Sequence, residues 1–180
     1  MKKCLLILLC LMVFVSSLIY AQDDPDFGFT GVVKEYVLKQ INPKITPNLT
    51  DAANIADPMK VLMVGFSKLE PTDVDFECFH FVTYYYPDSV FTNYVALIVA
   101  NASNKNRSGV DVSIEVIGPK SSKIQVKRTI PMYTVMMYVF EFNNRFSADF
   151  TGIYDIIGTV NHRLAWCSQA FTRLVIDDIW

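Results

Sequence analysis

The sequence predicts an all-β fold, an antiparallel sandwich preceded by a short, less regular N-terminal segment. Apolar and polar residues alternate from Val110 to Val116, which is the period of a half-buried strand. After Lys60, turn residues recur about every 8–12 residues, a spacing typical of antiparallel sandwiches and barrels. The chain also holds 9 Tyr and 13 Phe, and aromatic side chains suit the pleated surface of a sheet.

The first 21 residues have the layout of a secretory signal peptide. Lys2 and Lys3 precede an apolar run from Leu5 to Val15, and Ala21 provides a small residue at a cleavage position. We expect cleavage after Ala21 and export, either out of the cell or into a bacterial periplasm. An uncleaved membrane anchor is the alternative, because residues 4–21 approach the roughly 20 apolar residues that cross a bilayer.

Residues 22–180 would form the mature protein, which is one domain by its length. The chain has 16 basic residues, and removal of Lys2 and Lys3 leaves 14 against 18 acidic residues, a net charge of −4. No basic patch is visible, which argues against nucleic acid and anionic membrane surfaces as partners. A chain this long buries enough surface to fold without a metal, and we expect no cofactor. We also expect no membrane-spanning segment after cleavage.

Residues 22–59 are expected to form a lead-in that packs on the main domain. Apolar residues within 32–41 approximate helical spacing, but the valines favour a strand, so both structures remain open. Asn42-Pro43 and Thr46-Pro47 then interrupt regular structure, and residues 51–57 can form a helical turn.

The strands of the main domain, residues 60–180, are expected where apolar runs lie between turn signals. Residues 110–116 and 123–127 alternate between apolar and polar side chains, which predicts two strands with one buried face. Residues 135–142 are apolar on both faces, which is typical of a central strand. The remaining expected strands are residues 61–66, 73–86, 91–100, 153–160 and 171–176.

The segment from Thr151 to Val160 resembles the penultimate strand of immunoglobulin-like sandwiches, which often opens with Gly-x-Tyr, here Gly152-Ile153-Tyr154. This resemblance, which covers residues 90–162, implies an immunoglobulin-like sandwich. It also implies that Tyr154 is a tyrosine corner, whose hydroxyl bonds to upstream backbone. Antibody-type domains carry a cysteine two residues after this tyrosine, where this chain has Ile156. A fold of this kind does not fix a function.

Cys78 and Cys167 are the cysteines left after cleavage at Ala21, and in an oxidising compartment we expect them to form a disulfide. Two buried free thiols are the alternative. Together with His80 and His162, the two cysteines also match the ligand count of a structural zinc site. Their spacing departs from the usual zinc motifs, so we expect no metal there.

Acidic and aromatic residues share the segment from residue 73 to residue 86. Asp73, Asp75 and Glu77 would lie on one face of a strand, where they could hold calcium, but a solvated edge-strand face is the favoured interpretation. Most of the aromatic residues are expected in the core. Consecutive strand residues point to opposite faces, so the aromatic residues of this segment cannot all lie in one core. We therefore expect Tyr84, Tyr85 and Tyr86 to form a partner-binding surface.

Three Asn-x-Ser/Thr sequons begin at Asn48, Asn101 and Asn106, and they matter only in a eukaryotic secretory pathway. The loop formed by residues 101–109 contains two of them. It is polar and ends in glycine, so we expect it to be exposed.

The sequence favours a secreted, non-enzymatic binding or structural module whose partner is a protein or a glycan. It contains no Gly-x-Ser-x-Gly, His-Glu-x-x-His or phosphate-binding glycine motif. The alternative is a small hydrolase or metal-dependent enzyme that uses His80, His162 and nearby carboxylates. That alternative requires the two histidines to converge in an open cleft. The sequence does not indicate an oligomeric state.

Overall fold

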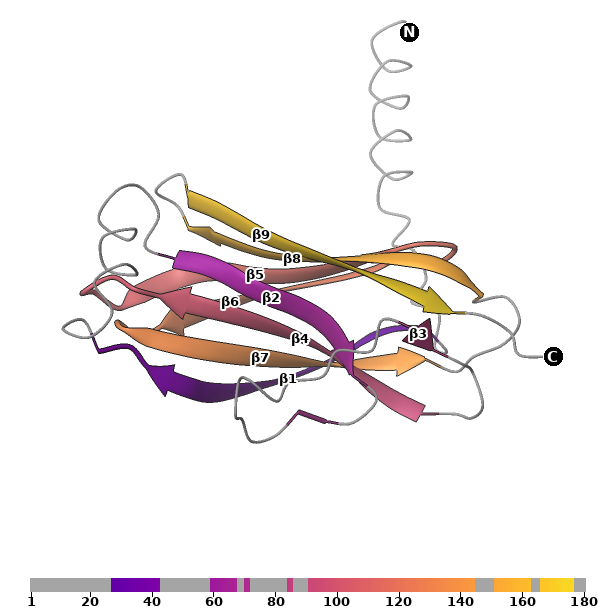
Figure 1. Cartoon of the computed structure of the whole chain (residues 1–180), viewed down its shortest axis with the longest axis horizontal. Coiled ribbons are helices and arrows are strands. Elements are labelled where there is room, and N and C mark those ends of the chain that lie inside the picture. Colours follow the sequence, from indigo (N-terminus) through magenta and orange to yellow (C-terminus); the bar gives the residue numbers. More distant parts are fainter. Residues whose placement is uncertain are drawn as a thin grey trace, which may run out of the picture.

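The computed structural model describes residues 27–42, 59–67, 70–71, 84–85, 91–144, 151–162 and 166–176. These residues form two facing sheets, so the predicted all-β sandwich is confirmed (Figure 1). Within the described residues, no helix has the length and apolar character needed to cross a membrane.

Sheet A has four strands in the order β1-β7-β4-β2. Its strands are β1 (Phe27–Gln40), β2 (Met59–Ser67), β4 (Phe91–Asn101) and β7 (Thr134–Asn144). Sheet B has the order β3-β9-β8-β5-β6. Its strands are β3 (Tyr84–Tyr85), β5 (Arg107–Ile117), β6 (Ser122–Ile130), β8 (Gly152–His162) and β9 (Trp166–Ile176). All neighbours are antiparallel except β3, which pairs parallel with β9.

The strands expected from apolar runs are confirmed in seven places, as β2 and β4 to β9. The largest difference is in β9, which begins at Trp166 and not at Phe171. Of the expected strand 73–86, only the two residues of β3 are described, and residues 51–57 lie outside the described residues.

β1 comes from the segment expected as a lead-in, and it is a full edge strand of sheet A. The strand alternative for residues 32–41 is therefore the one that the structure contains. Register shifts interrupt its pairing with β7 between Phe29 and Val33 and between Val37 and Lys39. The first shift places two extra residues in β1 and leaves Phe29 and Val33 on the same face, whereas the second adds one residue at Leu38 and changes the alternation after it. The strand therefore lacks a continuous period of two.

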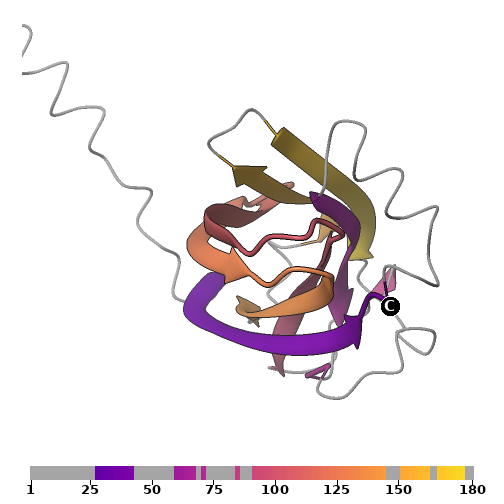
Figure 2. The ribbon, with the colours of Figure 1, turned by 90° about the vertical axis from the view of Figure 1, so that its left-hand side faces the viewer.

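The main core lies between the two sheets (Figure 2). From β5, Val110, Val112, Ile114 and Val116 all point into it, as their alternation predicts. At one end, aromatic rings from both sheets meet. Phe27 lies 5.0 Å from Phe142 and 5.7 Å from Tyr154, measured between ring centroids. These edge and tilted contacts join β1 and β7 of sheet A to β8 of sheet B.

Sheet A is also buried on its outer face. The buried residues of this second cluster include Ala96, Ile98 and Ala100 of β4 with Val135, Met137 and Val139 of β7. β7 is therefore buried on both faces and lies between β1 and β4, which confirms the central strand predicted for residues 135–142.

Hydrogen bonds from backbone amides to serine hydroxyls close the two long sides of the sandwich. On one side, the backbone amide of Val61 in β2 donates to Ser168 Oγ of β9 over 3.0 Å. On the other side, the amide of Phe29 in β1 donates to Ser122 Oγ of β6 over 3.3 Å. Both amides lie beside a register shift in an edge strand, where regular pairing is interrupted. An ion pair between Arg128 of β6 and Glu35 of β1 adds to the second side.

Candidate interaction surface

The outer face of sheet B carries large apolar side chains in solvent. Phe171 of β9 is 58% exposed, Ile153 of β8 is 57% exposed and Ile117 of β5 is 42% exposed. Strand pairing places Phe171 opposite Ile157, and Ile153 opposite Val175. Paired residues point to the same face, so these side chains form one contiguous patch. We call it the β8–β9 face and define it by Ile117, Ile153, Asp155, Ile157, Phe171, Arg173 and Val175.

An ion pair lies in the middle of the β8–β9 face. Arg173 Nε donates to Asp155 Oδ1 over 2.8 Å, and a second guanidinium nitrogen reaches Oδ2 over 3.4 Å. The hydrogen bonds to Asp155 raise the pKa of Arg173, so the guanidinium stays charged. The guanidinium also lies 5.8 Å from the centroid of the Phe171 ring, within reach of a cation–π contact. The ion pair with Asp155 and the cation–π contact with Phe171 hold the Arg173 side chain against the patch.

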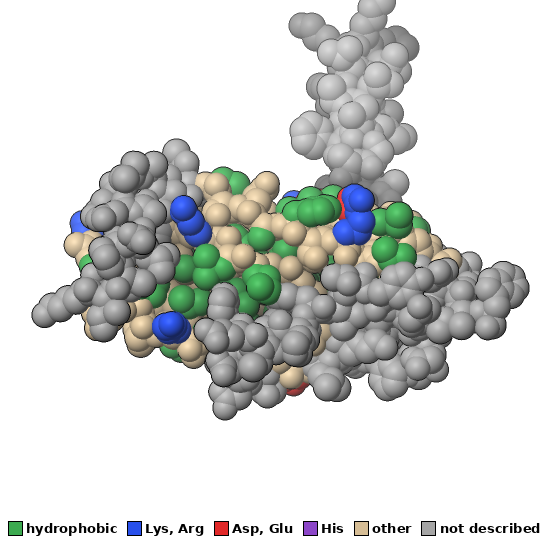
Figure 3. Space-filling model, viewed as in Figure 1, with side chains coloured by type: hydrophobic (Ala, Val, Ile, Leu, Met, Phe, Trp, Pro, Cys, Tyr) green, Lys and Arg blue, Asp and Glu red, His purple; other side chains and the backbone are tan. Residues whose placement is uncertain are grey.

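Figure 3 shows groups of hydrophobic side chains on the visible surface, with a few lysine or arginine side chains beside them. Single exposed apolar residues are ordinary, but a contiguous patch with a fixed charge pair has the composition of a protein interface. Sequence reasoning missed this face. The sequence does contain a sign of it, because positions 153, 157, 171 and 175 point outward and are apolar. A strand with one face in solvent normally has polar residues at such positions.

Of the predicted partner surface of Tyr84, Tyr85 and Tyr86, the structure places the backbone of the first two residues, which form β3 beside this face. β3 pairs parallel with the end of β9, and the backbone of Tyr84 lies opposite Val175. Tyr86 lies outside the described residues. A role for the three tyrosines in binding stays a prediction.

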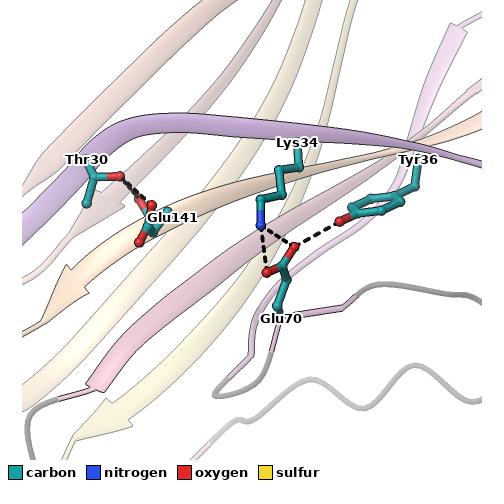
Figure 4. Close-up of polar contacts among 5 residues, drawn as sticks. All are labelled: Thr30, Lys34, Tyr36, Glu70 and Glu141. Atoms are coloured by element: carbon teal, nitrogen blue, oxygen red, sulfur yellow. Dashed lines mark hydrogen bonds and ion pairs between the residues drawn. The ribbon is translucent and has the colours of Figure 1, made fainter.

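A second polar cluster lies on the outer face of sheet A (Figure 4). Lys34 Nζ donates to both carboxylate oxygens of Glu70, over 2.6 and 2.7 Å, and Tyr36 Oη donates to Glu70 Oε1 over 2.9 Å. We call these three residues the Glu70 latch. β2 ends at Ser67 on one edge of sheet A, and Glu70 contacts β1 on the other edge. The latch therefore fixes the chain after β2 against the far side of its own sheet.

The charges of the Glu70 latch stabilise one another. The hydrogen bonds from Lys34 and then Tyr36 lower the pKa of Glu70, and the hydrogen bond to Glu70 raises the pKa of Lys34. Partial desolvation, followed by the hydrogen bond to Glu70, raises the pKa of Tyr36. A carboxylate with a lowered pKa is a poor general base near neutral pH. The arrangement therefore acts as a structural contact.

A hollow of about 120 Å³ adjoins the Glu70 latch and is lined by Val32, Lys34, Tyr94, Val139 and Glu141. Thr30 Oγ1 donates to Glu141 Oε2 over 3.2 Å at its rim, so this carboxylate is also engaged. Pockets for small organic ligands measure roughly 300–1,000 Å³. The hollow is too small for such a ligand.

The four residues weighed as a zinc site are only partly described, because Cys78 and His80 lie outside the described residues. His162 Nε2 lies 3.2 Å from the carbonyl oxygen of Ser108. Cys167 is exposed, and no disulfide joins it to a described residue. Cys167 pairs with Asn161 and not with His162, so Cys167 and His162 point to opposite faces of sheet B. The disulfide between Cys78 and Cys167 stays a prediction.

The structure does not test the enzyme alternative, because His80 and the carboxylates of residues 73–77 lie outside the described residues. The described residues contain no group of three or more His, Cys, Asp or Glu side chains that could hold a metal ion.

The expectation that the whole loop 101–109 is exposed is wrong at its beginning. Asn101 and Ser103 are buried, whereas Asn106 is exposed. The Asn101 amide nitrogen donates to the carbonyl oxygens of Lys105, Ile130 and Pro131, over 2.9 to 3.1 Å. Its amide oxygen accepts hydrogen bonds from the backbone and hydroxyl of Ser103. Asn101 thus satisfies carbonyls at one end of the sandwich, and burial follows from that role.

Tyr154 is buried near the start of β8. Its hydroxyl bonds to the backbone of Lys120, in the turn between β5 and β6, and burial raises the pKa of Tyr154 to about 12. The partner lies upstream, but 34 residues away and not a few residues away as in tyrosine corners. The tyrosine-corner role of Tyr154 stays a prediction.

No model of a known protein family matches the chain, and no curated protein matches it.

Proposed function

We propose that the chain is a secreted, non-enzymatic binding module with an immunoglobulin-like fold, and that its β8–β9 face binds a protein partner. The observation that carries the proposal is the contiguous exposed patch around the Asp155–Arg173 ion pair. Aromatic and arginine side chains are the residues most enriched where proteins bind one another, and Phe171 and Arg173 supply both.

The strand order supports the immunoglobulin-like assignment. Immunoglobulin domains order their strands A-B-E-D in one sheet and G-F-C in the other. Here β2-β4-β7 correspond to A-B-E and β9-β8-β5 correspond to G-F-C, with β6 in the additional position next to C. The chain visits these strands in the same sequence, and β1 occupies the edge next to E. Tyr154 then lies near the start of strand F, where the resemblance expects it.

The signal peptide supplies the route for such a module. We propose that residues 1–21 direct export and that the mature chain begins at Gln22. Mass spectrometry of the secreted protein gives this N-terminus directly. A product that retains residues 1–21 would contradict this part of the proposal.

The binding proposal is tested with labelled mature protein on intact cells and extracellular material of the source organism. We expect saturable binding that falls at least tenfold when Phe171→Ser and Ile153→Ser are combined. The matched control is Thr159→Ala with Gln169→Ala, because these residues lie on the same strands outside the patch. Equal binding by both variants would contradict the proposed face.

The class of partner is tested on the same surfaces. Treatment with protease is expected to abolish binding, and treatment with glycosidases is expected to leave it intact. The reverse result would contradict a protein partner and indicate a glycan.

A further inference from the structure

The two sequons between β4 and β5 have the same chemical motif but opposite environments. Asn101 begins the first, with Ser103 as its hydroxyl residue, and Asn106 begins the second, with Ser108. The motif alone makes both asparagines N-glycan acceptors. The structure shows that only one of the two asparagines, Asn106, is exposed.

Asn101 has no room for a sugar in the folded protein. Its side chain is fully buried, and three carbonyl oxygens lie within 3.1 Å of the amide nitrogen to which a glycan would be attached. Glycosylation replaces an N–H hydrogen with a sugar carbon, so it would remove a donor from this cluster and insert a bulky group into it. A chain modified at Asn101 could not form these hydrogen bonds, and unpaired buried carbonyls destabilise a fold.

Asn106 has the opposite geometry. It is exposed, and its amide oxygen accepts the backbone N–H of Met132 over 2.9 Å. That bond fixes the carboxamide through its oxygen, while the nitrogen makes no hydrogen bond to a described residue. Glycosylation retains the amide oxygen, so the contact with Met132 survives it. Ser108 is exposed as well, which keeps the sequon hydroxyl accessible.

We infer that Asn106 is an N-glycosylation site and that Asn101 is unmodified in the folded, secreted protein. This inference depends on the proposed function with export through a eukaryotic secretory pathway, which is the route that attaches N-glycans to such sequons. A glycan at Asn106 is compatible with the proposed binding face. Asn106 precedes the first residue of β5 and Ile117 is its last residue. At about 3.4 Å per residue, the length of this strand separates the two by roughly 37 Å.

The test is secretion of the full chain from a eukaryotic cell, with its own leader and, in parallel, with a proven heterologous leader. A Thr50→Ala background removes the sequon at Asn48. In that background we expect one glycan, which is released by peptide N-glycosidase and maps to Asn106. Asn106→Gln and Ser108→Ala should each abolish it. Ser108→Ala retains the hydrogen bond between Asn106 and Met132, so this variant should leave the thermal unfolding midpoint of the deglycosylated protein unchanged.

Two results would overturn the inference: an occupied Asn101 in the folded, secreted protein, or an unoccupied Asn106 in protein secreted with the heterologous leader. Failure of secretion with the chain's own leader alone would contradict the proposed route, and the heterologous leader would still test the site.

Discussion

Gly118 lies directly against the ring of Tyr154. A Cβ atom added at position 118 would overlap the ring carbons of Tyr154 and would lie 2.9 Å from the carbonyl oxygen of Ile153. Tyr154 is buried, and its hydroxyl is bound to Lys120, so the ring is held in place from both ends. The turn after β5 can therefore approach β8 only with a glycine at this position.

We expect Gly118→Ala to lower the free energy of unfolding by about 1–3 kcal/mol, the usual cost of overpacking. Urea denaturation measures this cost. In a Tyr154→Leu background the ring is absent, so the same substitution should cost less. An equal cost in both backgrounds would show that the ring does not restrict position 118.

Two buried tyrosines should respond in opposite ways to loss of the hydroxyl. Tyr154→Phe removes a hydrogen bond to the Lys120 backbone and should cost about 1 kcal/mol of stability. Tyr138 of β7 is fully buried, and its hydroxyl has no hydrogen-bond partner among the described residues. Tyr138→Phe should therefore be neutral or stabilising, because it removes an unpaired buried polar group. Paired urea titrations give both signs, and a cost for Tyr138→Phe equal to that for Tyr154→Phe would contradict this prediction.

Stability should fall at alkaline pH. Burial raises the pKa of Tyr154 to about 12 and raises the pKa of Tyr138 as well. Tyrosines in the unfolded chain ionise near pH 10, so above that pH the unfolded state binds fewer protons than the folded state. The stabilisation is complete below about pH 10 and is lost as the pH rises through the folded pKa. The urea midpoint should decrease over this range, and Tyr154→Phe should decrease less steeply than the wild type. An identical pH dependence for the two proteins would contradict a raised pKa at Tyr154.

Gly158 of β8 lets the two sheets approach each other. A Cβ atom there would overlap the Leu97 side chain of β4 and would lie 3.0 Å from Val64 Cβ of β2. Gly158→Ala should cost about 1–3 kcal/mol by overpacking, and Leu97→Ala should cost about 2–5 kcal/mol by opening a cavity. The double variant should cost less than the sum, because the added methyl enters the space that Leu97 vacates. Strict additivity in a double-mutant cycle would show that the two residues do not compete for space.

The sequence predicted the strands whose apolar residues follow one period, and it was ambiguous in β1, where apolar residues lie on both faces among polar ones. β5 alternates without interruption between Val110 and Val116, and its register follows from the pattern. In β1, Val33 packs against the main core and Tyr36 and Leu38 pack against the outer cluster, so apolar residues lie on both faces and also fit helical spacing. The first half of β9 was missed because its inward residue Ser168 bonds to β2 and carries no apolar signal.

Sites were harder to predict than strands. A polar residue in the sequence can be exposed to solvent or buried and hydrogen-bonded to other residues, and its residue type does not distinguish the two. Asn101 and Asn106 have the same residue type and the same motif. Only the fold brings the carbonyls of Ile130 and Pro131 to Asn101, from 29 and 30 residues away. The β8–β9 face likewise depends on cross-strand neighbours, such as Ile157 and Phe171, that the linear sequence does not bring together.

The serines that close the sides of the sandwich also limit aggregation. Amyloid growth begins where an edge strand presents unoccupied amides to another chain. β1 and β2 are the two outermost strands of sheet A, and each gives an amide at an irregular point to a hydroxyl of the opposite layer. An incoming strand would have to displace Ser122 or Ser168 before it could pair at these two amides, which makes these points of the sheet edge poor sites for strand addition.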